Sequence, residues 1–183
     1  MPEGFSGEPL TRWDGSRNMV LVEAFSYIDP DGRQWAVPAG ATLNGATIPR
    51  ALWTSIGSPY AGQYRRASVV HDYYVGEIDN SDVTPEQRKE ADRKFYNACR
   101  YDGCSKEFAA LLYIGVRFGT WASKWSDLFK MSDFGEVLED IRNIPEFTFT
   151  MDKFWQMADS AKDAIKNEDL DLIDEIMETH FSK

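Results

Sequence analysis

The segment that most constrains the fold is a helix whose two ends are both marked in the sequence. Thr84 is followed by Pro85 and by Gln87, which is the pattern of a capping box with proline at the first helical position. The helical pattern continues to about Tyr101 and stops at the Asp102-Gly103 pair. Any fold of this chain therefore has to accommodate a straight helix of roughly five turns.

Two apolar runs near the N-terminus predict a β-hairpin. Residues Met19 to Ile28 and Arg33 to Val37 are rich in β-branched and aromatic side chains, and Asp29-Pro30-Asp31-Gly32 between them is typical of a tight turn. A loop of small residues follows over 41–47. A short helix is expected over 48–57.

The middle of the chain is expected to be helical on both sides of the capped helix. One helix is predicted over about 62–75, and another begins after Ser105 and extends to about Trp125. The linker over 76–83 is short, so the first two helices should be antiparallel neighbours. The chain is therefore expected to have an α+β fold, with an N-terminal β-hairpin and a mainly helical core built around this helix pair.

The net charge of −10 is concentrated at the C-terminal end. Residues 132–183 hold 14 Asp and Glu against 5 Lys and Arg, a net of −9, whereas residues 1–131 carry a net of −1. Two amphipathic patterns, 154–165 and 170–181, predict a helical hairpin there. We expect a motif-bearing α+β domain over 1–131 and an acidic helical extension over 132–183. That extension is either a solvated helical face or a surface for a basic partner.

Composition excludes several classes of protein. The chain lacks the basic face of a conventional nucleic-acid binder and any apolar run as long as a transmembrane segment. Its start, MPEGFSGEP, is not a signal peptide. Cys99 and Cys104 can form neither a disulfide framework nor a complete zinc site. We expect a protein of a reducing compartment.

A histidine and an aspartate on the two antiparallel helices form the candidate catalytic pair. His71 lies in an apolar and aromatic stretch, where a histidine is most often a core residue. Asp92 lies at the edge of the apolar face of the capped helix, and a buried carboxylate without a partner is costly. If Asp92 bonds one imidazole nitrogen, it fixes the tautomer and leaves the other nitrogen as a general base for water or a hydroxyl.

Several arginines lie near this pair in the sequence, and their role stays open. They are Arg50, Arg65, Arg66, Arg88 and Arg93. They either neutralise nearby carboxylates, such as Asp72 and Asp92, or bind an anionic group of a substrate, such as a phosphate.

Four ordered motifs within residues 4–121 resemble a small family of unknown function associated with phages and prophages. The motifs are VPAG at 37–40, LNGATIPR at 43–50, HDYYV at 71–75 and EADRKFY at 90–96, where the family typically has VPAG, TDGASIPR, HDYLY and EADRxFY. Asn44 thus replaces the usual Asp, Thr47 the usual Ser and Val75 the usual Tyr. The resemblance implies an α+β domain and a location in the cytoplasm of a host cell or in a virion, but no activity.

A shorter resemblance, to secreted calcium-dependent phospholipases, implies a mechanism. Those enzymes also carry a His-Asp pair on one helix and an Asp-Arg motif on an antiparallel helix. The resemblance implies that His71 activates water, that Asp92 orients it and that Asp72 is a carboxylate ligand of Ca²⁺. The loop that contains Asn44, Gly45 and Arg50 would then line the substrate and oxyanion side of the site.

Two functions follow as hypotheses. The first is a hydrolase of an ester or another acyl bond that uses the His71–Asp92 dyad. A pocket that exposes one nitrogen of His71 beside Asp72 and the Asn44 loop would favour it. The second is a non-catalytic phage accessory or anti-defence protein that binds a host or virion partner through its acidic surface. A buried His71 with both nitrogens bonded would favour that alternative.

Overall fold

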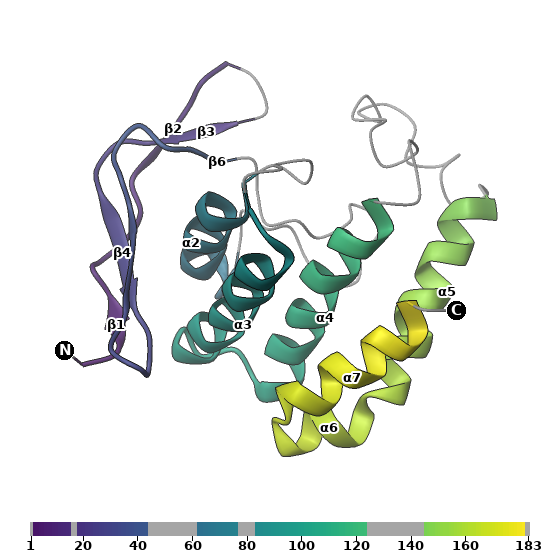
Figure 1. The fold of residues 1–183 in the computed structure, drawn as a ribbon. Coiled ribbons are helices and arrows are strands. Elements are labelled where there is room, and N and C mark those ends of the chain that lie inside the picture. The colour runs from purple at the N-terminus through teal and green to yellow at the C-terminus, as the bar shows by residue number, and fades with distance from the viewer. Residues whose placement is uncertain (1, 16–17, 44–61, 77–82, 124–144, 182–183) are drawn as a thin grey trace.

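The computed structural model describes residues 2–15, 18–43, 62–76, 83–123 and 145–181. Within these residues, two small antiparallel sheets lie beside a body of helices (Figure 1). The first sheet has the order β1-β4-β5, formed by Gly4–Phe5, Phe25–Ile28 and Gln34–Val37. The second has the order β2-β3-β6, formed by Thr11–Trp13, Met19–Leu21 and Thr42–Leu43. The α+β fold class predicted from the sequence is confirmed.

The predicted hairpin is the pair β4 and β5. Phe25 faces Val37 across the ladder, and the Oδ1 atom of Asp29 accepts hydrogen bonds from the backbone N–H groups of Asp31 (2.9 Å) and Arg33 (3.0 Å). Gly32 has a φ of +82°, which favours glycine at the end of this turn. The aspartate and the glycine of the turn therefore do what their residue types predict.

Only the second part of the run Met19 to Ile28, from which the hairpin was predicted, belongs to that hairpin. The run divides into β3 and β4, which belong to different sheets, because the backbone of Leu21 pairs with Ala41 (2.9 Å) instead of continuing along β5. Strands β1, β2 and β6 were not expected either. They are two or three residues long, so partners distant in the sequence hold them in place.

Helices α2, α3 and α4 span Arg65–Val75, Pro85–Tyr101 and Lys106–Ser123. The capping box of α3 is confirmed, since the N–H of Gln87 donates to Thr84 Oγ1 (3.2 Å) and the N–H of Thr84 donates to Gln87 Oε1 (2.9 Å). Ser105 caps α4 by accepting from the N–H of Phe108 (3.1 Å). The helix expected over 48–57 lies outside the described residues.

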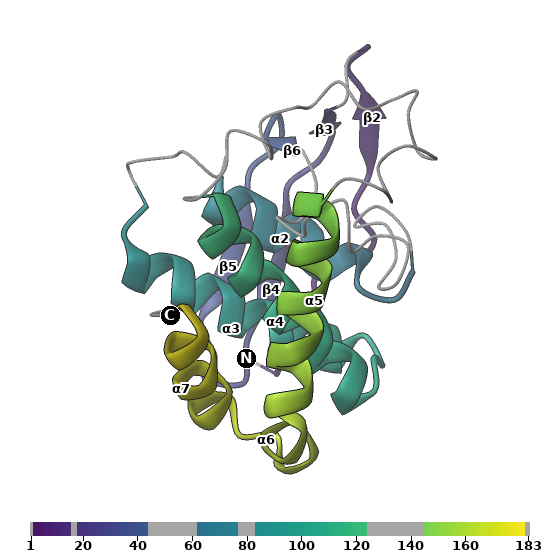
Figure 2. The same ribbon diagram turned by 90° about the vertical axis from the view of Figure 1, so that its right-hand side faces the viewer.

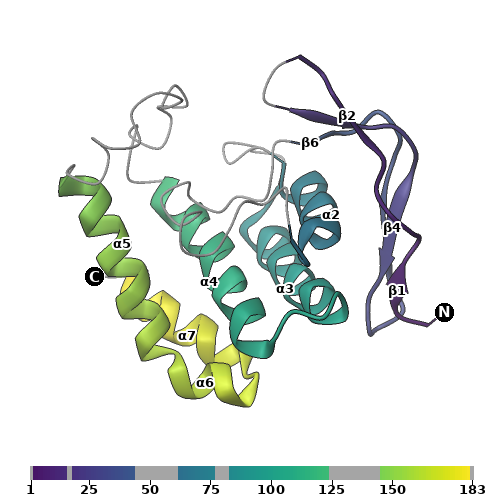
Figure 3. The ribbon, with the colours of Figure 1, turned by 180° about the vertical axis from the view of Figure 1, so that it is seen from behind.

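Helices α2 and α3 are antiparallel, as predicted. Arg66 at the start of α2 bonds Asp102 at the end of α3, and His71 further along α2 meets Asp92 in the middle of α3. Figure 3 shows the layers in order from the sheets through α2 and α3 to α4.

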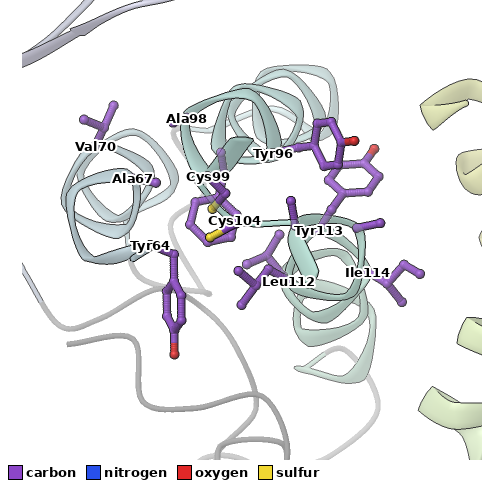
Figure 4. Close-up of a cluster of buried hydrophobic side chains, with 14 of the residues drawn as sticks. Tyr64, Ala67, Val70, Tyr96, Ala98, Cys99, Cys104, Leu112, Tyr113 and Ile114 are labelled. Atoms are coloured by element: carbon purple, nitrogen blue, oxygen red, sulfur yellow. The ribbon is translucent and has the colours of Figure 1, made fainter. Parts of the chain in front are cut away.

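Side chains from α2, α3 and α4 meet in a common core (Figure 4). Ala67, Val70, Ala98, Cys99, Leu112 and Ile114 are all buried there. The side chains of Cys99 and Cys104 point toward one another. Burial raises the pKa of the Cys99 thiol, and the hydrogen bond with Cys99 lowers that of Cys104. Both thiols are free and buried, which fits a packing role.

The acidic C-terminal segment is helical, as expected, and packs against α4 (Figure 2). It consists of α5 (Pro145–Ser160), α6 (Lys162–Asn167) and α7 (Leu170–Phe181). Its apolar side chains, which include Phe154, Met157, Ile165, Ile173 and Met177, belong to the same buried cluster as those of α4. The division at residues 131 and 132 stays a prediction, because that boundary lies outside the described residues.

Candidate functional site

The two residues of the predicted dyad are hydrogen-bonded. His71 Nε2 lies 2.7 Å from Asp92 Oδ1, and both side chains are almost fully buried, with the whole residues 2% and 0% exposed. Because a carboxylate only accepts, Nε2 is the donor of this bond, and in a neutral ring Nδ1 is then the nitrogen without a proton. The expected juxtaposition of these two side chains is therefore confirmed.

The second imidazole nitrogen makes no bond within the described part of the chain. His71 Nδ1 is buried and has no hydrogen-bond partner there. The ring packs against Phe95, with 4.9 Å between ring centroids. It also lines a cavity of about 10 Å³ between α2, α3 and the first sheet, whose other walls include Tyr27, Trp35 and Tyr74. A space of this size is at the limit for a single water molecule.

A second carboxylate, from the acidic segment, is connected to the dyad through an arginine. Asp92 Oδ2 lies 3.6 Å from Nη1 of Arg117 on α4, and Nε of the same arginine lies 3.4 Å from Oδ1 of Asp174 on α7. His71, Asp92, Arg117 and Asp174 thus form one chain of polar groups across four helices, in which all members except the partly exposed Arg117 are buried. We call these four residues the polar chain.

Asp174 is the most heavily bonded member of the polar chain. Its Oδ1 accepts from the hydroxyl of Tyr113 (2.6 Å), and its Oδ2 lies 2.5 Å from Arg93 Nη2 and 3.1 Å from Lys89 Nζ. Burial alone would raise the pKa of this carboxyl, but the bonds from Tyr113 and Arg93 and the charge of Arg117 outweigh it, so the pKa lies below its usual value.

Arg117 and Asp174 were not among the candidate residues from the sequence, although each carries a signal. Arg117 is the single charged residue in the otherwise apolar run 109–121. Asp174 directly follows Ile173 and precedes Met177 by three positions, so it borders the apolar face of its helix. A charge on an apolar helix face requires a partner, and each of these residues is the other's partner.

The remaining candidates for the active site are only partly described. Asp72 is buried on α2, next to His71 in the chain. Asn44, Gly45 and Arg50 lie outside the described residues. Within the described part of the chain, no group of three or more His, Cys, Asp or Glu is placed to hold a metal ion. The assignment of Asp72 to Ca²⁺ therefore stays a prediction.

Two of the candidate arginines, Arg66 and Arg93, form ion pairs with carboxylates. Arg66 bonds Asp102 and lies 3.3 Å from Glu8, and Arg93 bonds Asp171 and Asp174. These two neutralise carboxylates, which is one of the roles left open by the sequence. Arg65 is exposed.

Arg88 differs from the paired arginines. It is only 6% exposed, and its Nη1 is buried without a hydrogen-bond partner in the described residues. Burial lowers the pKa of this guanidinium, while the charge of Asp92 acts in the opposite direction.

Comparison with known proteins finds relatives without an assigned activity. Residues 19–116 match a family described as "Protein of unknown function (DUF1353)". Two relatives from Sinorhizobium fredii, the uncharacterized proteins y4jT and y4iH, are 34% and 33% identical over 58% and 56% of this chain. The matched region covers 29% and 40% of those longer proteins. No solved structure matches.

No described helix combines the length and the apolar character that crossing a membrane would require.

Proposed function

This chain belongs to the DUF1353 family of proteins of unknown function, and we propose that it is a hydrolase of an ester or another acyl bond. In this proposal His71 is the general base and Asp92 orients it. One observation carries the proposal: Asp92 fixes His71 Nε2 at 2.7 Å, while Nδ1 is buried without a hydrogen-bond partner among the described residues. A buried polar atom normally has a partner, so an unpaired basic nitrogen suits proton transfer to a bound molecule.

The chemistry assigned to the dyad is activation of water. Nδ1 would take a proton from a water molecule as that water attacks the acyl carbon, and Asp92 would stabilise the imidazolium that forms. The bond between the acyl carbon and the leaving oxygen would then break, and the imidazolium would return its proton to the departing alkoxide. The nearby cavity is large enough for about one water molecule, not for an acyl group. Hydrolysis therefore requires the side chains around His71 to move and admit the substrate.

A substitution of His71 tests this proposal directly. The chain is assayed against a panel of p-nitrophenyl esters and phosphatidylcholine vesicles as wild type, as His71→Asn and as the control His180→Asn, which changes the other histidine of the sequence. Asn can still donate to Asp92, so the fold should persist while turnover falls by about 10²–10⁴-fold. Full activity in a well-folded His71→Asn chain would refute the general base.

The calcium expectation is tested in the same assay. If Asp72 binds Ca²⁺, a chelator should abolish turnover, added Ca²⁺ should restore it, and Asp72→Asn should remove this dependence. Turnover that is equal with and without chelator would remove the metal from the mechanism.

A second candidate function is that of a non-catalytic phage accessory or anti-defence protein, located in the host cytoplasm or the virion. The observation that favours it is the outward direction of the tail carboxylates, since the side chains of Asp163 and Asp171 are 92% and 83% exposed. Such a surface suits a basic partner. In that case, the biological effect of the chain should be unchanged in His71→Asn and lost when these carboxylates are replaced by amides.

A further inference from the structure

Arg88 presents a buried cation next to the dyad. It lies on α3 one helical turn before Asp92, so the two side chains emerge from the same face of the helix. Its guanidinium Nη1 is fully enclosed, yet it donates to no described residue. Arg88 also forms no ion pair with a described carboxylate, in contrast to Arg66 and Arg93 on the same helix pair.

Asp92 does not serve as a full counter-ion for Arg88. Its Oδ1 accepts from His71, and its Oδ2, which has no hydrogen-bond partner among the described residues, lies 3.6 Å from Nη1 of Arg117. The attraction between Asp92 and Arg88 only partly offsets the burial of the guanidinium, because the pKa of Arg88 remains below its ordinary value. A desolvated cation with an unused N–H donor is costly to the folded chain, and binding of an anion would remove that cost.

We propose that Arg88 binds an oxyanion of the ligand, a phosphate or a carboxylate, beside the His71–Asp92 dyad. The planar guanidinium offers parallel N–H donors that match two oxygens of such a group. If the chain is the proposed hydrolase, on which this part of the inference rests, its substrate would be an ester that carries an anionic group. Arg88 would hold the charged group while His71 activates water against the acyl carbon.

Anion binding is measured on the full chain by thermal unfolding, with sodium phosphate, sodium acetate or sodium chloride added at constant ionic strength. The variants are Arg88→Gln, Arg88→Lys and the matched control Arg100→Gln, which lies on the same helix and pairs with Glu168. Phosphate or acetate, but not chloride, should raise the Tm of the wild type and the control by roughly 5–10 °C at 100 times the Kd. Comparing phosphate with acetate identifies which oxyanion the site prefers.

Arg88→Gln should abolish this rise in Tm. Arg88→Lys keeps the charge and should reduce the rise, so it serves as the test variant if the Arg88→Gln chain does not fold. An equal rise in wild type and Arg88→Gln, or no rise in the wild type with either oxyanion, would overturn the site. The measurement does not involve turnover. If the wild type binds phosphate or acetate through Arg88 but hydrolyses no ester, the proposed hydrolase fails and the oxyanion site stands.

Discussion

At the scale of single residues, the dyad depends on Asp92 as much as on His71. A histidine in an apolar helix is compatible with a core role and with a catalytic role, and its partner decides which nitrogen remains available. Here the carboxylate takes Nε2 and is itself connected to Arg117. The chemistry available at His71 therefore follows from the position of Asp92.

Two substitutions of Asp92 should have different effects. Asp92→Asn keeps an acceptor for Nε2–H and should lower the free energy of unfolding by about 1–1.5 kcal/mol, the difference between a hydrogen bond to a charged and to a neutral group. Asp92→Ala should cost about 3–5 kcal/mol, because it leaves the cation of Arg117, whose side chain is only 13% exposed, without this partner. Urea denaturation measures both, with the exposed Asp171→Asn as control. Equal losses in the two variants would contradict a specific bond to His71.

Asp174 should make the stability of the fold depend on pH. Its pKa is lower in the folded chain than in the unfolded chain, so its stabilisation is present above the unfolded value of 3.8 and disappears as the pH falls through the folded value. Wild type should therefore exceed Asp174→Asn in stability by more at pH 7 than at pH 3. Urea unfolding at both pH values measures this difference. A gap that does not change with pH would exclude a bonded, ionised Asp174.

At the scale of elements, α3 positions most of the site. It carries Asp92 and Phe95 against His71 of α2, with Arg88 one turn before Asp92, and it carries Lys89 and Arg93 toward α7. The start of this helix is held by the reciprocal bonds of Thr84 and Gln87. A substitution that removes this cap should therefore weaken the helix that positions Asp92.

The cap of α3 can be tested by Thr84→Ala. The N-cap side chain would no longer accept from Gln87, so the free energy of unfolding should fall by about 1 kcal/mol. Thr179→Ala, an exposed threonine inside α7, is the matched control and should change stability by less than about 0.5 kcal/mol. Thermal or urea unfolding compares them. If both variants lose the same stability, the capping box does not stabilise the helix.

At the scale of the whole molecule, the acidic segment is joined to the rest by both apolar and polar contacts. Phe154 packs edge-on against Phe118 of α4 at 5.9 Å between ring centroids, and Asp174 bonds side chains of α3 and α4. Among the carboxylates of this segment whose exposure the structure describes, all except Asp174 are exposed, while its apolar side chains share the core.

Ending the chain after residue 123 should therefore abolish cooperative unfolding, because the core face of α4 would be exposed to water. The control is the full chain with Asp163→Asn and Asp171→Asn, which removes exposed charge and should unfold cooperatively. Near-ultraviolet circular dichroism and thermal unfolding measure both. A truncated chain that melts cooperatively would show that residues 1–123 form an independent domain.

Several features followed from the amino-acid sequence because the interactions behind them are local. The capping box at Thr84, the turn at Asp29–Gly32 and the helical patterns of the tail each depend on residues a few positions apart. The partner of Asp92 could also be inferred. The ionisable groups expected on the inner face of the neighbouring helix were His71 and Asp72, of which the imidazole can donate to a carboxylate, and a short linker implied antiparallel packing.

Tertiary structure alone decided the rest. The pairing of Leu21 with Ala41, which breaks the run Met19–Ile28 into two strands, joins backbone groups twenty positions apart. The bonds between Asp174 and residues of α3 and α4 join side chains 61 and 81 positions apart. The periodicity of the sequence does not specify such partners, because burying a charged side chain is favourable only after the two helices that carry the partners have packed together. For the same reason, the sequence could place Arg88 near the dyad but could not distinguish it from the arginines that pair with carboxylates.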